Sequence, residues 1–133
     1  MIEPEPGRRG HWAATAVAAL GAVAGVVLAV GTGLRRIVVE GDSMRPTLEP
    51  GDRLLLVPCR RPSVGDLVAV PDPRSGRLLV KRVRAVDGLS VEVVGDNPAA
   101  STDSRAFGPV PRRVLRGRVV RRYHPRGRSG PVR

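Results

Sequence analysis

GDSMRPTLEPGD, at residues 41–52, is the stretch around which the rest of the chain is organised. Ser43 lies between Asp42 and the apolar Met44, and Pro46 fixes the backbone three residues further on. The letters EPGD that close the stretch are typical of a turn. Such a loop presents one hydroxyl, but the same residue types also form ordinary solvated turns. The role of Ser43 therefore depends on the partners that the rest of the chain supplies.

Downstream of this loop, β-rich runs alternate with Gly, Pro and Asp, which predicts a mainly β fold of six strands with little helix. The expected strands are residues 37–40, 53–57, 66–70, 78–86, 89–94 and 114–122. The runs 78–86 and 114–122 alternate apolar with basic residues, so many arginines are expected on the solvent face of half-buried strands. A chain of 133 residues has room for one small domain and an anchor.

Upstream, after a polar flank at residues 1–11, residues 12–34 carry no charge and are rich in Ala, Val and Gly. As a helix they would span about 34 Å, compared with about 30 Å for the hydrocarbon core of a bilayer. A retained transmembrane helix is favoured over a cleavable signal peptide or a buried helix, because the apolar run continues to Leu34, well beyond the sequence AVA at 22–24. Arginines flank both ends, so charge does not set the orientation.

The formal net charge of +11 first suggests a nucleic-acid or anionic membrane partner. A nucleic-acid partner is not expected, because the single Trp, Phe and Tyr lie far apart and offer no stacking platform among the basic residues. The single cysteine, Cys59, rules out an intrachain disulfide and a CxxC motif. The two histidines lie beside the apolar stretch and in the C-terminal tail, where neither fits a Ser-His-Asp triad. No metal and no cofactor are expected.

A serine nucleophile needs a base, and Lys81 is the candidate. It is the only lysine among 23 basic residues, and it follows the apolar run Leu78–Val80. Arginine does not give up its proton in proteins, so a lysine at one position indicates a task that arginine cannot perform. A stray lysine on a strand face is the alternative, and for Lys81 alone the two interpretations are balanced. Ser43 and Lys81 together favour a Ser-Lys pair.

A third stretch, GDNPAASTDSRAFGPVP at 95–111, is predicted to be a long polar loop that leaves a strand. It carries Ser101, Asp103 and Arg105 close together. A hydroxyl here could orient an amine, and an Asp-Arg pair could brace the loop.

Four boxes, GDSMRPTLEPGD, GDLVAV, VKRV and GDNPAASTDSRAFGPV, occur in the order seen in type I signal peptidases, the serine proteases that remove secretory leaders. The resemblance extends from residue 37 to about residue 123. It implies a compact signal-peptidase-like β-fold after one transmembrane helix. It also implies Ser43 as nucleophile, Lys81 as general base, Ser101 as hydrogen-bond partner of the lysine, and Asp103 and Arg105 as a structural ion pair.

The resemblance further implies an oxyanion hole that uses the Ser43 backbone N–H. Some relatives add a serine hydroxyl at the position of Gly41, and this chain lacks it. Small residues are expected at the cleavage site and at the third position before it, in apolar pockets lined by Met44, Ile37 and Val39. The implied partners are precursor proteins with leader peptides and the lipid bilayer. The catalytic domain, residues 37–123, is expected outside the cytoplasm, followed by a mobile basic tail at 124–133.

Only 13 residues separate Lys81 from Gly95, which leaves no room for the extra β-domain of larger leader peptidases. The chain is similar to short forms such as mitochondrial inner-membrane peptidases and the maturation protease of nickel superoxide dismutase, so a protease dedicated to one precursor is an alternative. LexA-like repressors share Ser-Lys chemistry, but residues 1–36 cannot supply their DNA-binding domain. The non-enzyme alternative is a basic membrane protein that binds anionic lipid or nucleic acid.

Overall fold

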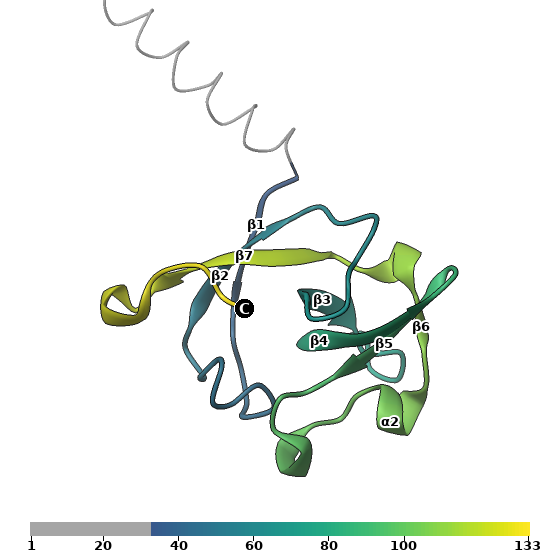
Figure 1. Cartoon of the computed structure of the whole chain (residues 1–133). Helices are drawn as coiled ribbons and strands as arrows, with labels where there is room; N and C mark the ends of the chain where they lie inside the picture. Colours follow the sequence, from purple (N-terminus) through teal and green to yellow (C-terminus); the bar gives the residue numbers. More distant parts are fainter. Residues whose placement is uncertain (1–32) are drawn as a thin grey trace, which may run out of the picture. The chain divides into compact units, whose positions relative to one another are not determined.

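Seven antiparallel strands in the order β1-β2-β7-β3-β4-β5-β6 form one sheet in the computed structural model, which describes residues 33–133 (Figure 1). The strands are β1 (Arg35–Val38), β2 (Arg53–Val57), β3 (Leu67–Pro71), β4 (Leu78–Asp87), β5 (Ser90–Val94), β6 (Val110–Pro111) and β7 (Gly117–His124). Four single turns of helix complete the fold: η1 (Pro98–Ala100), α2 (Ser104–Phe107), η2 (Arg112–Val114) and η3 (Arg126–Arg128). The predicted mainly β character is therefore confirmed.

The boundaries of two strands, β1 and β7, differ most from the prediction. β1 begins at Arg35 and ends at Val38, two residues earlier than expected. β7 begins only at Gly117, because residues 112–114 form the 3-10 turn η2 after Pro111. The short strand β6 was not predicted, since its two residues, Val110 and Pro111, give no alternating pattern.

The predicted transmembrane helix falls almost wholly outside the described residues. Of the stretch 12–34, only residues 33 and 34 are described. Within residues 33–133, no helix has the length and apolar character needed to cross a bilayer.

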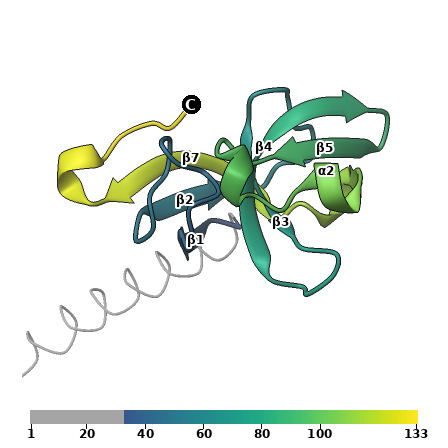
Figure 2. The same ribbon diagram turned by 90° about the horizontal axis from the view of Figure 1, so that it is seen from below.

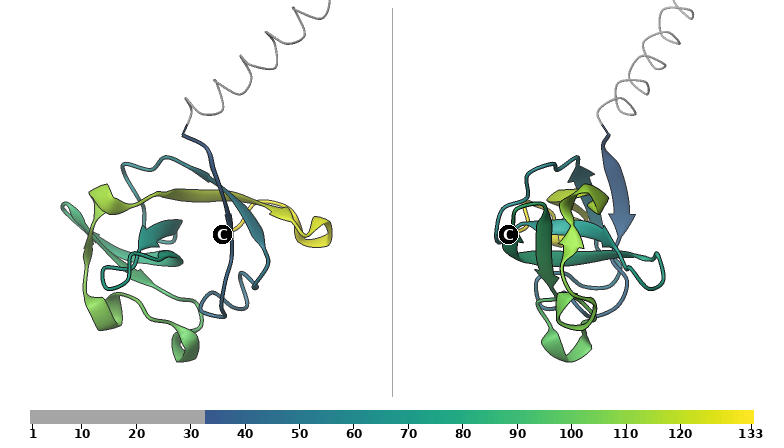
Figure 3. Two further views of the ribbon diagram at one scale, coloured as in Figure 1. Left: turned by 180° about the vertical axis from the view of Figure 1, so that it is seen from behind. Right: turned by 90° about the vertical axis from the view of Figure 1, so that its right-hand side faces the viewer.

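β3 is buried on both faces and joins two apolar clusters. Leu67 and Ala69 pack in a cluster with side chains of β2, β7 and the 39–48 segment, while Val68 and Val70 pack in a second cluster with β4, β5 and β6. Successive residues of a strand point to opposite faces, which explains why LVAV is apolar throughout. Figures 2 and 3 show β1, β2 and β7 on one side of β3, with β4, β5 and α2 on the other.

The C-terminal segment packs against the fold instead of forming the mobile tail that its composition predicted. After η3 the chain turns back, and Arg122 and Gly130 exchange two backbone hydrogen bonds of 2.9 Å. Val132 packs against the first apolar cluster, and Arg128 reaches the loop after Ser43. The contacts of Arg128 join residues 76 and 79 positions apart, so local composition carries no signal for them.

Candidate active site

The loop that carries Ser43 is anchored on both sides of the serine. Met44 and Leu48 are buried in the first apolar cluster, and Leu48 N–H donates to Met44 O at 2.9 Å. The end of the loop, at Gly51 and Asp52, pairs with Val39. The Val39 N–H donates to Asp52 O, and the Val39 carbonyl accepts from the Gly51 N–H. Ser43 itself remains partly exposed between these anchors. The loop thus holds one hydroxyl at the surface of a rigid frame.

A buried carboxylate fixes the far end of this loop. Asp52 is 2% exposed and accepts from Glu49 N–H, from Arg122 and from Arg128, at 3.0 to 3.3 Å. Arg122 also donates to Thr47 O at 3.1 Å. A buried charge is tolerated only when it is paired and hydrogen-bonded, and here both cations come from the C-terminal part of the chain.

Lys81 is buried in the middle of β4, with 2% of its surface exposed. The alternation of the strand puts Lys81 on the same face as Val83, and the register places it opposite the fully buried Val68. Burial lowers the pKa of the Lys81 amine, and this outweighs the smaller opposite effect of the Asp103 charge; Arg105 lowers the pKa further. The apolar setting thus favours the neutral amine that a general base requires.

Ser101, Asp103 and Arg105 form one chain of hydrogen bonds that ends on Lys81. Lys81 Nζ donates to Ser101 Oγ at 3.0 Å, and Ser101 Oγ donates to Asp103 Oδ2 at 2.6 Å. Because the only hydroxyl hydrogen of Ser101 goes to Asp103, Ser101 can only accept from the lysine. The lone pair of a neutral Lys81 amine is therefore left for another partner.

The Asp103 carboxylate is held ionised by its neighbours. Burial alone would raise its pKa, but hydrogen bonds from Arg105, from Ser101 and from the Gly95 N–H more than offset this and hold the pKa well below its usual range. Arg105 pairs with both carboxylate oxygens, at 2.9 and 2.5 Å. Asp103 and Arg105 therefore form an ion pair in the structure, and the Asp103 carboxylate also caps α2 by accepting from the Arg105 N–H.

Gly95, which residue-type reasoning did not single out, lies where the serine loop and the lysine loop meet. A Cβ at Gly95 would lie 2.2 Å from Ser101 Oγ and 2.6 Å from Ser43 O, both closer than real Cβ contacts allow. Asn97, two residues after Gly95, donates its backbone N–H to Ser43 O at 2.9 Å and a side-chain N–H to Asp42 O at 3.1 Å. The absence of a side chain at Gly95 thus lets the Ser43 backbone lie close to Ser101, which accepts the hydrogen bond from Lys81.

Three further side chains join the same two loops. Arg82 makes a two-pronged ion pair with Asp96, at 2.8 and 2.7 Å, and Asp96 accepts from Thr47 Oγ1 at 2.5 Å. Arg82 follows Lys81, Asp96 follows Gly95, and Thr47 belongs to the serine loop. Sequence reasoning missed all three; the repeated Gly-Asp pairs were the available signal, but Gly-Asp is also an ordinary turn.

The structure brings Ser43 and Lys81 to the same region without a direct bond between them. No hydrogen bond joins their side chains among the contacts of residues 33–133; the two are connected through Gly95 and Ser101. Catalytic hydrogen bonds are often long without substrate and shorten in the reacting complex. In the same described part, the Ser43 N–H donates no hydrogen bond. Gly41 has a φ of +74°, which glycine adopts readily.

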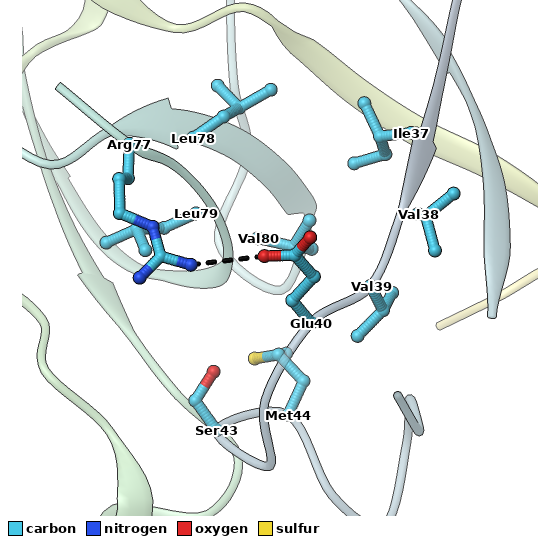
Figure 4. A pocket seen from close by; sticks show the side chains of 10 residues that line it. All are labelled: Ile37, Val38, Val39, Glu40, Ser43, Met44, Arg77, Leu78, Leu79 and Val80. Atoms are coloured by element: carbon cyan, nitrogen blue, oxygen red, sulfur yellow. Dashed lines mark hydrogen bonds and ion pairs between the residues drawn. The ribbon is translucent and has the colours of Figure 1, made fainter. Parts of the chain in front are cut away.

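A groove of about 410 Å³ opens beside Ser43 (Figure 4). Its lining is mostly apolar and comprises Ile37, Val38, Val39, Glu40, Ser43, Met44, Arg77, Leu78, Leu79 and Val80. All three residues expected to contact substrate, Ile37, Val39 and Met44, are in this set. One wall comes from β1 and the serine loop, and the other from the start of β4, immediately before Lys81.

Comparison with protein families matches residues 9–94 to signal peptidase, peptidase S26. The chain belongs to the peptidase S26 family of signal peptidases. Its membership makes it a serine-type endopeptidase. The matched range includes Ser43 and Lys81 and ends before the loop with Ser101, Asp103 and Arg105. Sequence reasoning therefore identified the family correctly.

Individual relatives of this S26 peptidase support the same assignment. The mitochondrial ATP-independent inner membrane protease subunit 1b of Arabidopsis thaliana is 32% identical, over 69% of this chain and 71% of the relative. The mitochondrial inner membrane protease subunit 1 of Xenopus tropicalis is 30% identical, over 73% of each chain. A probable signal peptidase I-1 of Synechocystis sp. is 28% identical, over 71% and 73%.

Residues 33–133 contain no group of three His, Cys, Asp or Glu side chains placed to hold a metal ion.

Proposed function

We propose that this S26 peptidase is a membrane-anchored endopeptidase in which Ser43 and Lys81 form a catalytic pair that removes leader peptides from exported or precursor proteins. The observation that carries the proposal is the burial of the chain's only lysine against Val68, with its amine bonded to Ser101 beside the Ser43 backbone. A lysine paired to a carboxylate at the surface would keep its proton. An apolar setting instead favours a neutral amine that can act as a base.

In the proposed reaction, Lys81 Nζ takes the proton of Ser43 as Oγ attacks the carbonyl carbon of the scissile bond. Negative charge develops on the carbonyl oxygen, and the Ser43 N–H is the candidate donor that stabilises it. Lys81 then gives the proton to the leaving amine, which departs and leaves an acyl-enzyme on Ser43. Lys81 next takes a proton from water as the water oxygen attacks the ester carbonyl carbon. The ester bond then breaks, Lys81 returns the proton to Ser43 Oγ, and the leader peptide leaves with a free carboxyl group.

Ser101, Asp103 and Arg105 have supporting tasks in this proposal. Ser101 holds the Lys81 side chain in one orientation by accepting a hydrogen bond from it. Since Ser101 donates its own hydrogen to Asp103, the lone pair of a neutral Lys81 amine stays free to accept the proton of Ser43. Arg105 offsets the charge of Asp103, which would otherwise favour the protonated amine.

The groove beside Ser43 supports binding of an extended peptide. Its apolar walls fit small apolar side chains, and bulky residues at the cut should be excluded by Met44 and the β1 residues. The short Lys81–Gly95 interval favours a protease dedicated to one precursor as the alternative.

Membrane attachment is proposed through residues 12–34, with the catalytic domain outside the cytoplasm. Two of the compared relatives are named as inner membrane proteases, which supports a membrane location. The apolar length of the stretch supports a single crossing.

The test is cleavage of a leader-bearing precursor by the full chain reconstituted in lipid. Wild type should cleave after a small residue, Ser43→Ala should not, and Ser63→Ala, an exposed serine away from the groove, should cleave normally. A bulky residue placed before the cut should abolish cleavage by wild type. Full activity of Ser43→Ala would remove the serine from the mechanism. Equal cleavage after a bulky residue would remove leader-peptidase specificity.

A further inference from the structure

One exposed ion pair crosses the groove beside Ser43. Arg77 Nη2 lies 3.1 Å from Glu40 Oε2, and the two side chains are 72% and 78% exposed. In Figure 4 the pair bridges the β4 wall, which Arg77 precedes, and the β1 wall, which Glu40 follows. Glu40 is three residues before Ser43, so the pair lies close to the proposed nucleophile.

These two residues are the only charged members of an otherwise mostly apolar lining. An extended peptide in the groove therefore meets one cation and one anion and no other formal charge from the lining. Exposed ion pairs contribute little to stability, so a substrate can separate this pair at small cost. Once separated, the planar guanidinium of Arg77 is available to bind a carboxylate through two parallel hydrogen bonds.

The surrounding charge favours an acidic partner over a basic one. Residues 1–32 contribute two arginines and two glutamates, so the whole net charge of +11 belongs to the part of the chain that the structure describes. Such a field attracts an acidic peptide side chain and repels a basic one. A substrate carboxylate can thus replace Glu40 on Arg77, whereas a substrate cation on Glu40 would face repulsion.

We propose that Arg77 is a specificity-determining residue that exchanges Glu40 for an acidic side chain of the precursor, near the scissile bond. The proposal rests on the proposed function of the groove as the substrate site. It adds a charge requirement to the size requirement, and it gives Glu40 the role of holding Arg77 in place until substrate binds.

The experiment uses the full chain in lipid nanodiscs and peptides that share small residues at the cut and at the third position before it. Asp, Asn or Lys is placed in turn at each other position flanking the cut, and kcat/KM is measured. Wild type should prefer Asp to Lys at one position by about tenfold, the scale expected for an attraction replaced by a repulsion at an exposed site. Arg77→Gln should remove most of this preference.

The decisive variant exchanges the two charges, Glu40→Arg with Arg77→Glu. It moves the cation to the other wall of the groove, so the preference for Asp at this position should be lost. Arg84→Gln is the matched control, because the Arg84–Glu92 ion pair, with side chains 50% and 38% exposed, lies outside the groove lining. This variant should keep the wild-type preference. Thermal melts establish that each variant is folded, and Arg77→Gln carries the test if the exchanged variant is not. An unchanged preference in a folded Arg77→Gln or exchanged variant would overturn the proposal.

The two levels of the proposal fail in different ways. Cleavage of all peptides by wild type, with no Asp–Lys discrimination at any position, would end the role of Arg77 but leave the peptidase function intact. Failure of wild type to cleave any peptide after a small residue would end the proposed function, and the role of Arg77 with it.

Discussion

Adding one methyl group at Gly95 should separate the two loops that the proposed mechanism needs together. In Gly95→Ala the new Cβ would lie 2.2 Å from Ser101 Oγ, 2.5 Å from Ser101 Cβ and 2.6 Å from Ser43 O. Restoring even a 3.0 Å separation requires shifts of roughly 0.4–0.8 Å. Ser101 can turn its hydroxyl, but Ser43 O is a backbone atom that already accepts from Asn97. The serine loop or the Ser101 loop must therefore move.

A misplacement of about 1 Å in a catalytic site costs up to about 100-fold in rate. We therefore expect kcat of Gly95→Ala to fall by about 10- to 100-fold. Overpacking of this kind also destabilises by about 1–3 kcal/mol, which thermal unfolding should detect.

The assay is steady-state cleavage of a leader-bearing precursor, with kcat and KM measured separately beside a melting curve. Gly127→Ala is the matched control, because its added Cβ meets nothing within 4 Å and its φ is not in the positive region. That control should leave kcat unchanged. A folded Gly95→Ala enzyme with the wild-type kcat would refute the reasoning that this close approach sets the geometry of the site.

Three other outcomes are expected. Arg105→Gln should shift the pH–activity profile to higher pH, because the uncompensated Asp103 charge raises the pKa of the Lys81 amine. Arg105→Lys should restore most of the wild-type profile, and an unshifted profile in Arg105→Gln would contradict this role of Arg105. Arg128→Gln should lower the free energy of unfolding by about 1–3 kcal/mol in chemical denaturation, since it leaves buried Asp52 with fewer hydrogen-bond partners. Arg126→Gln, at an exposed position, should leave the free energy of unfolding unchanged. Equal stability of the two variants would contradict the packing of the C-terminal segment. Protease added to intact spheroplasts should remove an epitope tag fused after Arg133, and removal only after lysis would overturn the proposed orientation.

Residue types pointed to Ser43, Lys81, Ser101, Asp103 and Arg105 as candidates, and the resemblance to signal peptidases supplied their expected roles. Each has a chemical signature that survives without structure: a serine in a turn, a lone lysine in an apolar strand, and a Ser-Asp-Arg cluster in one loop. The structure adds the chain of bonds from Arg105 through Asp103 and Ser101 to Lys81. The alternation of β4 also explains why Lys81 is buried, since it shares the face of Val83.

Contacts between residues that lie far apart in the sequence could not be predicted from residue types. Gly95 and Asp96 matter because two loops about 50 residues apart meet at them, and neither residue type is unusual in a turn. The C-terminal segment looked like a tail because Pro, Gly and Arg show no apolar period, yet Arg128 is fixed by a buried carboxylate from the serine loop. Long-range pairing of this kind depends on the fold, which local composition does not determine.

The most direct test of the central claim is the activity of Lys81→Arg. Arginine keeps the positive charge, but its guanidinium, with a pKa above about 12, cannot act as a base. Lys81→Met, which is neutral and similar in length, provides a second variant if a buried guanidinium prevents folding, and thermal melts accompany both. Wild-type activity should rise with pH through a pKa below the ordinary lysine value of 10.5, because the amine must lose its proton first. The Ser-Lys account predicts that both variants, once shown to be folded, are as inactive as Ser43→Ala. A folded Lys81→Arg or Lys81→Met enzyme that cleaves at a near wild-type rate would contradict it.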